Sequence, residues 1–189
     1  LQDSDARVQA AAVRQIRRRH VPNSMERLVG FLDHPAAEVR DAARSSLAEF
    51  NFMRYESAFE SFDEQVRKIT GRLVRKVDRS ATQRLIVLLT SPSPSTRFRG
   101  LEMVVAMEHA DAVLPQLIAL STDRDLDVRT EAMTALGLCS AEEALEALER
   151  AEQDPNPSVR DAAAAAIEVF MDRLATTQAQ SGGVPKGIH

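Results

Sequence analysis

The feature that most constrains this chain is a short pattern that recurs five times along it. Each copy has a Val or Thr, an Ala or Gly four residues later, and an aliphatic residue after four more; an Arg follows the Val or Thr in four copies. These copies start at Val8, Val39, Thr96, Val128 and Val159. Small or apolar residues at such intervals share one face of an α-helix. The sequence therefore predicts five copies of one amphipathic helix.

A second helix is predicted ahead of most copies. A leucine stands eleven residues before the Val or Thr, at Leu28, Leu85, Leu117 and Leu148. We expect these outer helices to begin near Asn23, Ser80 and Ser140, each of which precedes a Glu or Gln by three residues, as in a capping box. Turns rich in Asp and Pro separate the two helices, and proline ends one helix and tolerates the start of the next. The unit is thus a helix hairpin, which becomes stable by stacking on its neighbours.

Three segments carry a family resemblance: DHPAAEVRDAARSSL at 33–47, DRDLDVRTEAMTAL at 123–136 and DPNPSVRDAAAAAI at 154–167. They resemble HEAT repeats. The resemblance implies an all-α fold, a right-handed α-solenoid of about five hairpins over residues 1–175. It also implies that the turn aspartates and the arginines form a structural hydrogen-bonding ladder between neighbouring units, made of Asp33, Arg40, Arg97, Asp123, Arg129, Asp154 and Arg160.

One interval is longer than the others, since the copies are spaced by 31, 57, 32 and 31 residues. We interpret residues 51–79 within it as an insertion that contains one amphipathic helix. Its predicted apolar stripe is Val66, Ile69, Leu73 and Val77, and its predicted cationic face is Lys68, Arg72, Arg75 and Arg79. Either the charged face is only solvated, or it contacts an acidic partner, phosphates or anionic lipid. A second basic cluster, at Arg14, Arg17, Arg18, Arg19 and His20, is expected to stabilise a helix C-terminus.

Composition restricts the chemistry. The formal charge is −4 and the pI is near 5.6, so the whole molecule has no cationic field that attracts nucleic acid. Cys139 is the only cysteine, which excludes an internal disulfide and favours the cytoplasm. No apolar run is long enough to span a membrane. The four histidines are far apart and no catalytic motif is present, so we predict no catalytic residues, no metal and no cofactor.

The predicted function is a non-catalytic scaffold that binds a protein partner, or a neighbouring domain of the same chain, through its repeat surface. The alternative is nucleic-acid or anionic-surface binding through the basic helix. Two enzyme groups with similar repeats are weaker alternatives. Alkylpurine DNA glycosylases use aromatic residues around an extruded base, and this chain has no Trp; phycobilin lyases would need an aromatic pocket beyond the cluster Phe50 to Phe62. Residues 176–189, which are polar and contain Gly, are predicted to be a flexible tail or linker.

Overall fold

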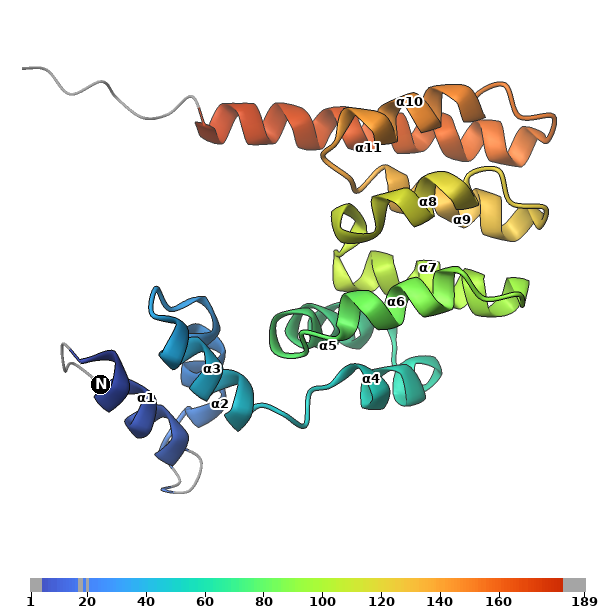
Figure 1. Cartoon of the computed structure of the whole chain (residues 1–189). Helices are drawn as coiled ribbons and strands as arrows, with labels where there is room; N and C mark the ends of the chain where they lie inside the picture. Colours follow the sequence, from blue (N-terminus) through green and yellow to red (C-terminus); the bar gives the residue numbers. More distant parts are fainter. Residues whose placement is uncertain (1–4, 17–18, 20, 182–189) are drawn as a thin grey trace, which may run out of the picture. The chain divides into compact units, whose positions relative to one another are not determined.

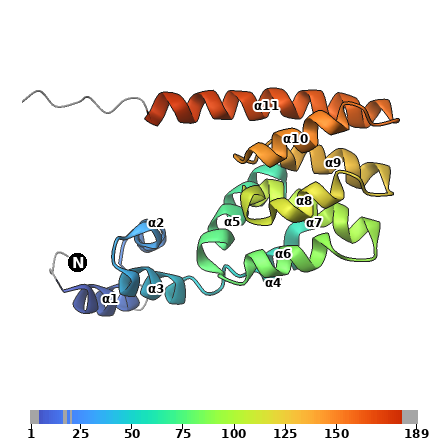
Figure 2. The same ribbon diagram turned by 45° about the horizontal axis from the view of Figure 1, so that its top comes forward.

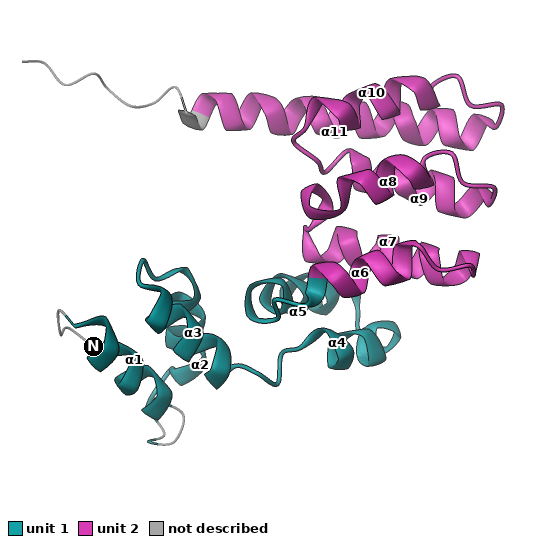
Figure 3. Cartoon of the chain, viewed as in Figure 1, with its two compact units in different colours: residues 1–81 teal, residues 82–189 magenta. Residues whose placement is uncertain are grey.

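The computed structural model of the chain describes residues 5–16, 19 and 21–181, and every regular element among them is helical (Figure 1). The predicted all-α fold of helix hairpins is therefore confirmed. Arg17, Arg18 and His20 of the second basic cluster and residues 182–189 of the predicted tail lie outside the described residues. The chain divides into two compact units, residues 1–81 and residues 82–189 (Figure 3). Each unit is described by itself below.

The second unit is a stack of helix hairpins. Its helices are α6 (Ala81–Leu89, which starts at the last residue of the first unit), α7 (Pro94–Met107), α8 (Leu114–Leu120, preceded by the 3-10 turn Ala110–Val113), α9 (Leu126–Leu136), α10 (Glu142–Ala151) and α11 (Pro157–Ser181). The inner helices α7, α9 and α11 pack in sequence against one another, while α8 and α10 pack on α9 and α11 (Figures 1 and 2). The predicted leucines Leu85, Leu117 and Leu148 are fully buried beneath the outer helices.

Small residues allow these helices to approach closely. A Cβ atom at Gly137 would lie 2.9 Å from the carbonyl oxygen of Ala166 on the next inner helix, closer than carbon and oxygen can pack. A Cβ atom at Gly100 would lie 3.0 Å from Cβ of Leu88 in α6. Gly100, four residues after Thr96, thus lies where inner helix α7 contacts its own outer helix α6. Gly137 lies where α9 contacts the next inner helix, α11.

The first unit contains α1 (Ala6–Gln15), α2 (Ser24–Gly30) with the 3-10 turn Phe31–Asp33, α3 (Ala37–Ser46), α4 (Phe52–Ala58) with the 3-10 turn Phe59–Ser61, and α5 (Glu64–Val77). Helix α1 packs along α3, and their apolar faces form a buried core with Leu28 and Leu32. Val8 is 49% exposed, so the prediction that it faces the core is wrong. Helix α1 buries Ala10, Val13 and Ile16 instead, because its neighbour is α3 and no described helix covers the side that carries Val8.

The predicted insertion is itself a helix hairpin, and this corrects the interpretation of residues 51–79 as one added helix. Helix α4 packs against α5, and the pair Val66-Arg67 occupies the position of Val-Arg in the other hairpins. With Val66 included, the long interval of 57 residues splits into 27 (39 to 66) and 30 (66 to 96). Arg67 also donates from Nε to the carbonyl oxygens of Phe59 and Phe62 in the preceding turn, at 2.9 and 3.1 Å.

Helix ends differ from the capping-box prediction. Asn23 has a left-handed backbone and makes no capping hydrogen bond, and Ala141, not Ser140, is the N-cap of α10. Side-chain caps instead lie three residues before the Val or Thr of the inner helices, at Asp5, Asp63, Ser93 and Asp125. The predicted tail is corrected at its start, since residues 176–181 belong to α11. Neither Gly nor Pro occurs in this helix between Pro157 and Gly182, so nothing in the sequence ends it earlier.

Candidate protein-interaction surface

The ladder residues of the second unit meet in pairs across neighbouring hairpins. The Nη2 atom of Arg97 donates to Oδ1 of Asp123 at 2.8 Å, and Nε of Arg129 lies 3.2 Å from Oδ2 of Asp154. All four side chains are largely shielded, with 10 to 16% of each exposed. Each arginine also donates to two carbonyl oxygens of its own turn, as Arg129 does to Asp123 and Arg124. The pairs therefore tie each inner helix to its own turn and to the turn of the next hairpin.

The remaining ladder residues, Asp33, Arg40 and Arg160, make no such arginine–aspartate pair among the described residues. Arg40 and Arg160 donate to the carbonyl oxygens of their own turns, with distances of 2.6 to 3.1 Å. Asp33 contacts Nζ of Lys76 at 2.6 Å and not an arginine, because Gln9 stands where the preceding hairpin would supply the guanidinium. This ion pair is exposed, in contrast to those of the second unit.

The charge state of Asp123 fits a structural role. Burial raises the pKa of this carboxyl group, but hydrogen bonds from Arg97 and from the backbone N–H of Asp125, with the charges of Arg97 and Arg129, outweigh burial and hold the pKa below its usual value. Asp123 therefore stays ionised within its shielded turn. Its carboxylate accepts hydrogen bonds from Arg97 and from the N–H of Asp125, and its backbone carbonyl oxygen accepts one from Arg129. It leaves no proton to exchange with a substrate near neutral pH.

The remaining reactive side chains are used by the fold. His34 accepts from the backbone N–H of Ala36 at 3.1 Å, and Nε2 of His109 lies 2.7 Å from Oγ1 of Thr82. The thiol of Cys139 is buried; burial and the charge of Asp111 raise its pKa to about 12. Within the described ranges no cluster of three or more His, Cys, Asp or Glu side chains has the geometry of a metal site. No helix described here is both long and apolar enough to cross a membrane.

Hairpin α4–α5 differs from hairpins α2–α3 and α8–α9 in one row of side chains. The Val of the pattern and the residues four and eight positions later are fully buried in α3 and in α9. In α5 the same row is Val66, Thr70 and Val74; Val66 is 37% exposed and Thr70 is only partly buried. The row lines a cavity of about 360 Å³, called here the α4–α5 groove. Its lining residues are Glu49, Phe50, Asn51, Arg54, Tyr55, Ala58, Phe62, Val66, Thr70 and Val74.

The groove has a rigid base. The hydroxyl of Tyr55 donates to the carbonyl oxygen of Arg67 at 2.8 Å, and burial raises the pKa of Tyr55, so this donor stays protonated. The guanidinium of Arg67 lies over the ring of Phe59, 4.2 Å from its centroid. The Tyr55 ring meets the Phe59 ring edge to face at 5.5 Å. The aromatic residues of this segment therefore fix α4 on α5 and keep the groove open between them.

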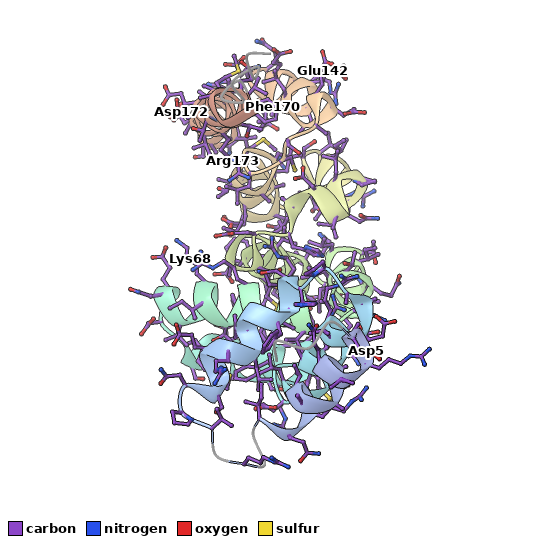
Figure 4. The ribbon with its side chains drawn as sticks, turned by 90° about the vertical axis from the view of Figure 1, so that its left-hand side faces the viewer. Asp5, Lys68, Glu142, Phe170, Asp172 and Arg173 are labelled. Atoms are coloured by element: carbon purple, nitrogen blue, oxygen red, sulfur yellow. The ribbon has the colours of Figure 1, made fainter. Side chains whose placement is uncertain are left out.

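The predicted cationic face lies on α5 or next to it, but part of its charge is balanced. Nζ of Lys68 contacts Oε1 of Glu64 at 2.6 Å, and Arg79 is paired with Asp41. Lys68 extends away from the helix in Figure 4. Arg72 is exposed and Arg75 is partly buried on the same side of α5. Of the predicted apolar stripe, Val77 is buried and Leu73 is partly buried, whereas Ile69 is 54% exposed.

A second cavity, of about 430 Å³, lies in the second unit beside α11. Cys139 and Ser140 form one side, and Phe170, Arg173 and Leu174 line it from α11, close to Asp172, which is labelled with Phe170 and Arg173 in Figure 4. The sequence analysis gave no sign of this cavity, because it depends on how far α11 extends past α10 (Figure 2).

The sequence does contain a signal for hairpin α4–α5 that the spacing concealed. Asp63 caps α5 by accepting from the N–H of Val66 at 2.8 Å, as Asp125 does for Val128 at 3.2 Å. The string Asp-x-x-Val-Arg is thus common to 63–67 and 125–129. A search for the cap together with the Val-Arg pair would have identified the extra hairpin.

Comparison with known proteins supports the repeat interpretation for part of the chain. Residues 82–168 match the family model for HEAT repeats. None of the curated proteins compared with this chain matches it. A designed armadillo repeat protein of known structure is 16% identical, with 89% of this chain and 96% of that chain covered and a TM-score of 0.43. Human deoxyhypusine hydroxylase in complex with glycerol is 19% identical over 90% of this chain and 82% of that chain, with a TM-score of 0.35.

Proposed function

Because residues 82–168 belong to the HEAT-repeat family, we propose that this chain is a non-catalytic scaffold that binds a protein partner through the surface of its repeats. The observation that carries the proposal is the α4–α5 groove. A row of side chains that α3 and α9 bury fully is partly open to solvent there, on a base held by aromatic contacts. Soluble proteins seldom leave such apolar surface uncovered unless another molecule covers it.

A catalytic role has less support. His34, His109 and Cys139 serve in the fold, and the shielded carboxylates of Asp123 and Asp154 are paired with arginines. The proposed setting is the cytoplasm, where the single thiol of Cys139 stays reduced. Nucleic-acid or anionic-surface binding through Lys68, Arg72, Arg75 and Arg79 is the alternative, and the nuclease treatment below tests it.

The experiment places a photo-crosslinking amino acid at Ile69 of the full chain, next to the groove, and at Val87 on α6 as the control. Ile69 is 54% and Val87 60% exposed, so both positions are accessible. We expect a defined set of proteins to crosslink from position 69 and not from position 87, before and after nuclease treatment. Val66→Glu in the same chain should abolish these products. Equal products from both positions, or products that disappear with nuclease, would refute the proposal.

A further inference from the structure

The α4–α5 groove is bordered by apolar residues on one side and by cations on the other. Val66 and Ile69 are exposed on neighbouring turns of α5. Ile69 lines a surface depression with Lys68 and Arg72, and Asp63, Glu64 and Gln65 line the same depression towards the N-terminus of α5. A ligand in the groove that continues over Ile69 would therefore place its far edge above Lys68 and Arg72.

The local charge of α5 is opposite to that of the whole molecule. Between Glu64 and Arg79 the sequence has six cations (Arg67, Lys68, Arg72, Arg75, Lys76 and Arg79) and two carboxylates (Glu64 and Asp78). The chain as a whole has a formal charge of −4. A cationic strip on an acidic protein attracts acidic ligands to that strip and repels them elsewhere.

The contact between Lys68 and Glu64 does not prevent such binding. Its two side chains are 47% and 81% exposed. An exposed pair four residues apart on a helix is weak, because water and salt screen its charges. Lys68 can therefore turn to a partner carboxylate at little cost.

The form of the ligand follows from the groove. Its walls are side chains of two helices, and no described segment presents a strand edge that could pair with an extended peptide. A helix satisfies its own backbone hydrogen bonds and needs only an apolar stripe to enter a groove. Building on the proposed function, we propose that the α4–α5 groove binds an amphipathic helix of a protein partner. The apolar stripe of that helix covers Val66 and Ile69, and acidic residues beside the stripe lie over Lys68 and Arg72.

The test uses two synthetic peptides with the same leucine stripe, one with Glu and one with Lys at the positions beside it. Binding to the full chain is measured by fluorescence anisotropy. We expect the Glu peptide to bind at least about tenfold more tightly than the Lys peptide, a difference of 1.4 kcal/mol. Ile69→Glu should weaken binding of the Glu peptide at least about tenfold, whereas the matched control Val87→Glu should change it less than about twofold. Circular dichroism checks that each variant keeps its helices.

Charge reversal separates the proposals. Lys68→Glu with Arg72→Glu should remove the preference for the Glu peptide. Equal binding of both peptides by the unmodified chain would overturn the acidic-helix inference, while the crosslinking test of the scaffold function could still succeed. A fluorescein-labelled DNA duplex is the third probe. If it binds more tightly than the Glu peptide and loses binding on the same charge reversal, the groove edge is a nucleic-acid site and the inference is wrong.

Discussion

Glu131 on α9 offers a direct test of the electrostatics of the inner helices. It is partly buried, and burial together with the neighbouring carboxylate of Glu102 raises its pKa from 4.5 to about 7. The folded chain then holds the proton more tightly than the unfolded chain, so stability falls as the pH rises from about 4.5 to 7. At about 1.4 kcal/mol per pH unit, the ionised form costs at most about 3 kcal/mol at pH 8.

The perturbation is Glu131→Gln, which keeps the shape of the side chain and removes its charge. We expect the variant to be more stable than the parent by about 1–3 kcal/mol at pH 8, and by less than about 0.5 kcal/mol at pH 4, where Glu131 is protonated in both states. The assay is urea unfolding followed by helical circular dichroism at both pH values. Glu149→Gln, at an exposed position of α10, is the control and should change stability little at either pH. An equal gain at pH 4 and pH 8 would refute the reasoning, because the gain would then not come from the charge.

Three further predictions concern the packing and the ladder. Asp123→Ala should destabilise the second unit by about 2–4 kcal/mol, because it leaves shielded Arg97 without its carboxylate. Asp33→Ala removes an exposed pair and should cost less than about 1 kcal/mol. Similar losses of stability for both variants in urea unfolding would contradict this. Gly137→Ala should lower stability by about 1–3 kcal/mol through the clash with Ala166, while Gly30→Ala, with nothing within 4 Å and a helical backbone, should be neutral or stabilising in thermal melts. Cys139 should react with a thiol reagent at pH 8 only after urea is added, because its thiol is buried and protonated; fast labelling of the native chain would exclude this.

The parts of the fold that could be predicted from the sequence are those set by local patterns. The Val-Arg pair, the small residue after it and the Asp-Pro turn identified α3, α9 and α11; α3 and α9 bury the whole row that the pattern marks, and α11 buries Val159 and Ala163 of it. Hairpin α4–α5 was missed because its row contains Thr70 in place of a small apolar residue and because Val66 follows the preceding Val by 27 residues, whereas the other intervals are 30 to 32. The cap at Asp63 and the pair Val66-Arg67 both mark this hairpin, but the cations of α5 favoured its interpretation as one added basic helix.

The partners of the charged residues could not be predicted, because they depend on how hairpins meet. The pairing of Asp33 with Lys76 joins positions 43 residues apart and links the turn before α3 to α5, a helix whose register was unknown from the sequence. The exposure of Ile69 could not be predicted from the sequence either. Its spacing from Val66 and Leu73 marks an apolar stripe, but whether a neighbouring helix covers that stripe is decided by tertiary packing.

The junction between α3 and α5 is made by polar contacts at one end of α5. Five residues after its Val, α9 has Met133, which is fully buried, whereas α3 has Arg44. Arg44 donates from Nε to the carbonyl oxygen of Lys76 at 3.0 Å, and Arg79 pairs with Asp41, so polar contacts at the C-terminal end of α5 hold this junction. Polar contacts fix position without needing an extended apolar interface. Val66 and Ile69 lie in the N-terminal half of α5, away from these contacts, and are exposed. Polar contacts at one end of α5 thus hold it to α3, while the apolar residues that border the groove remain open to another molecule.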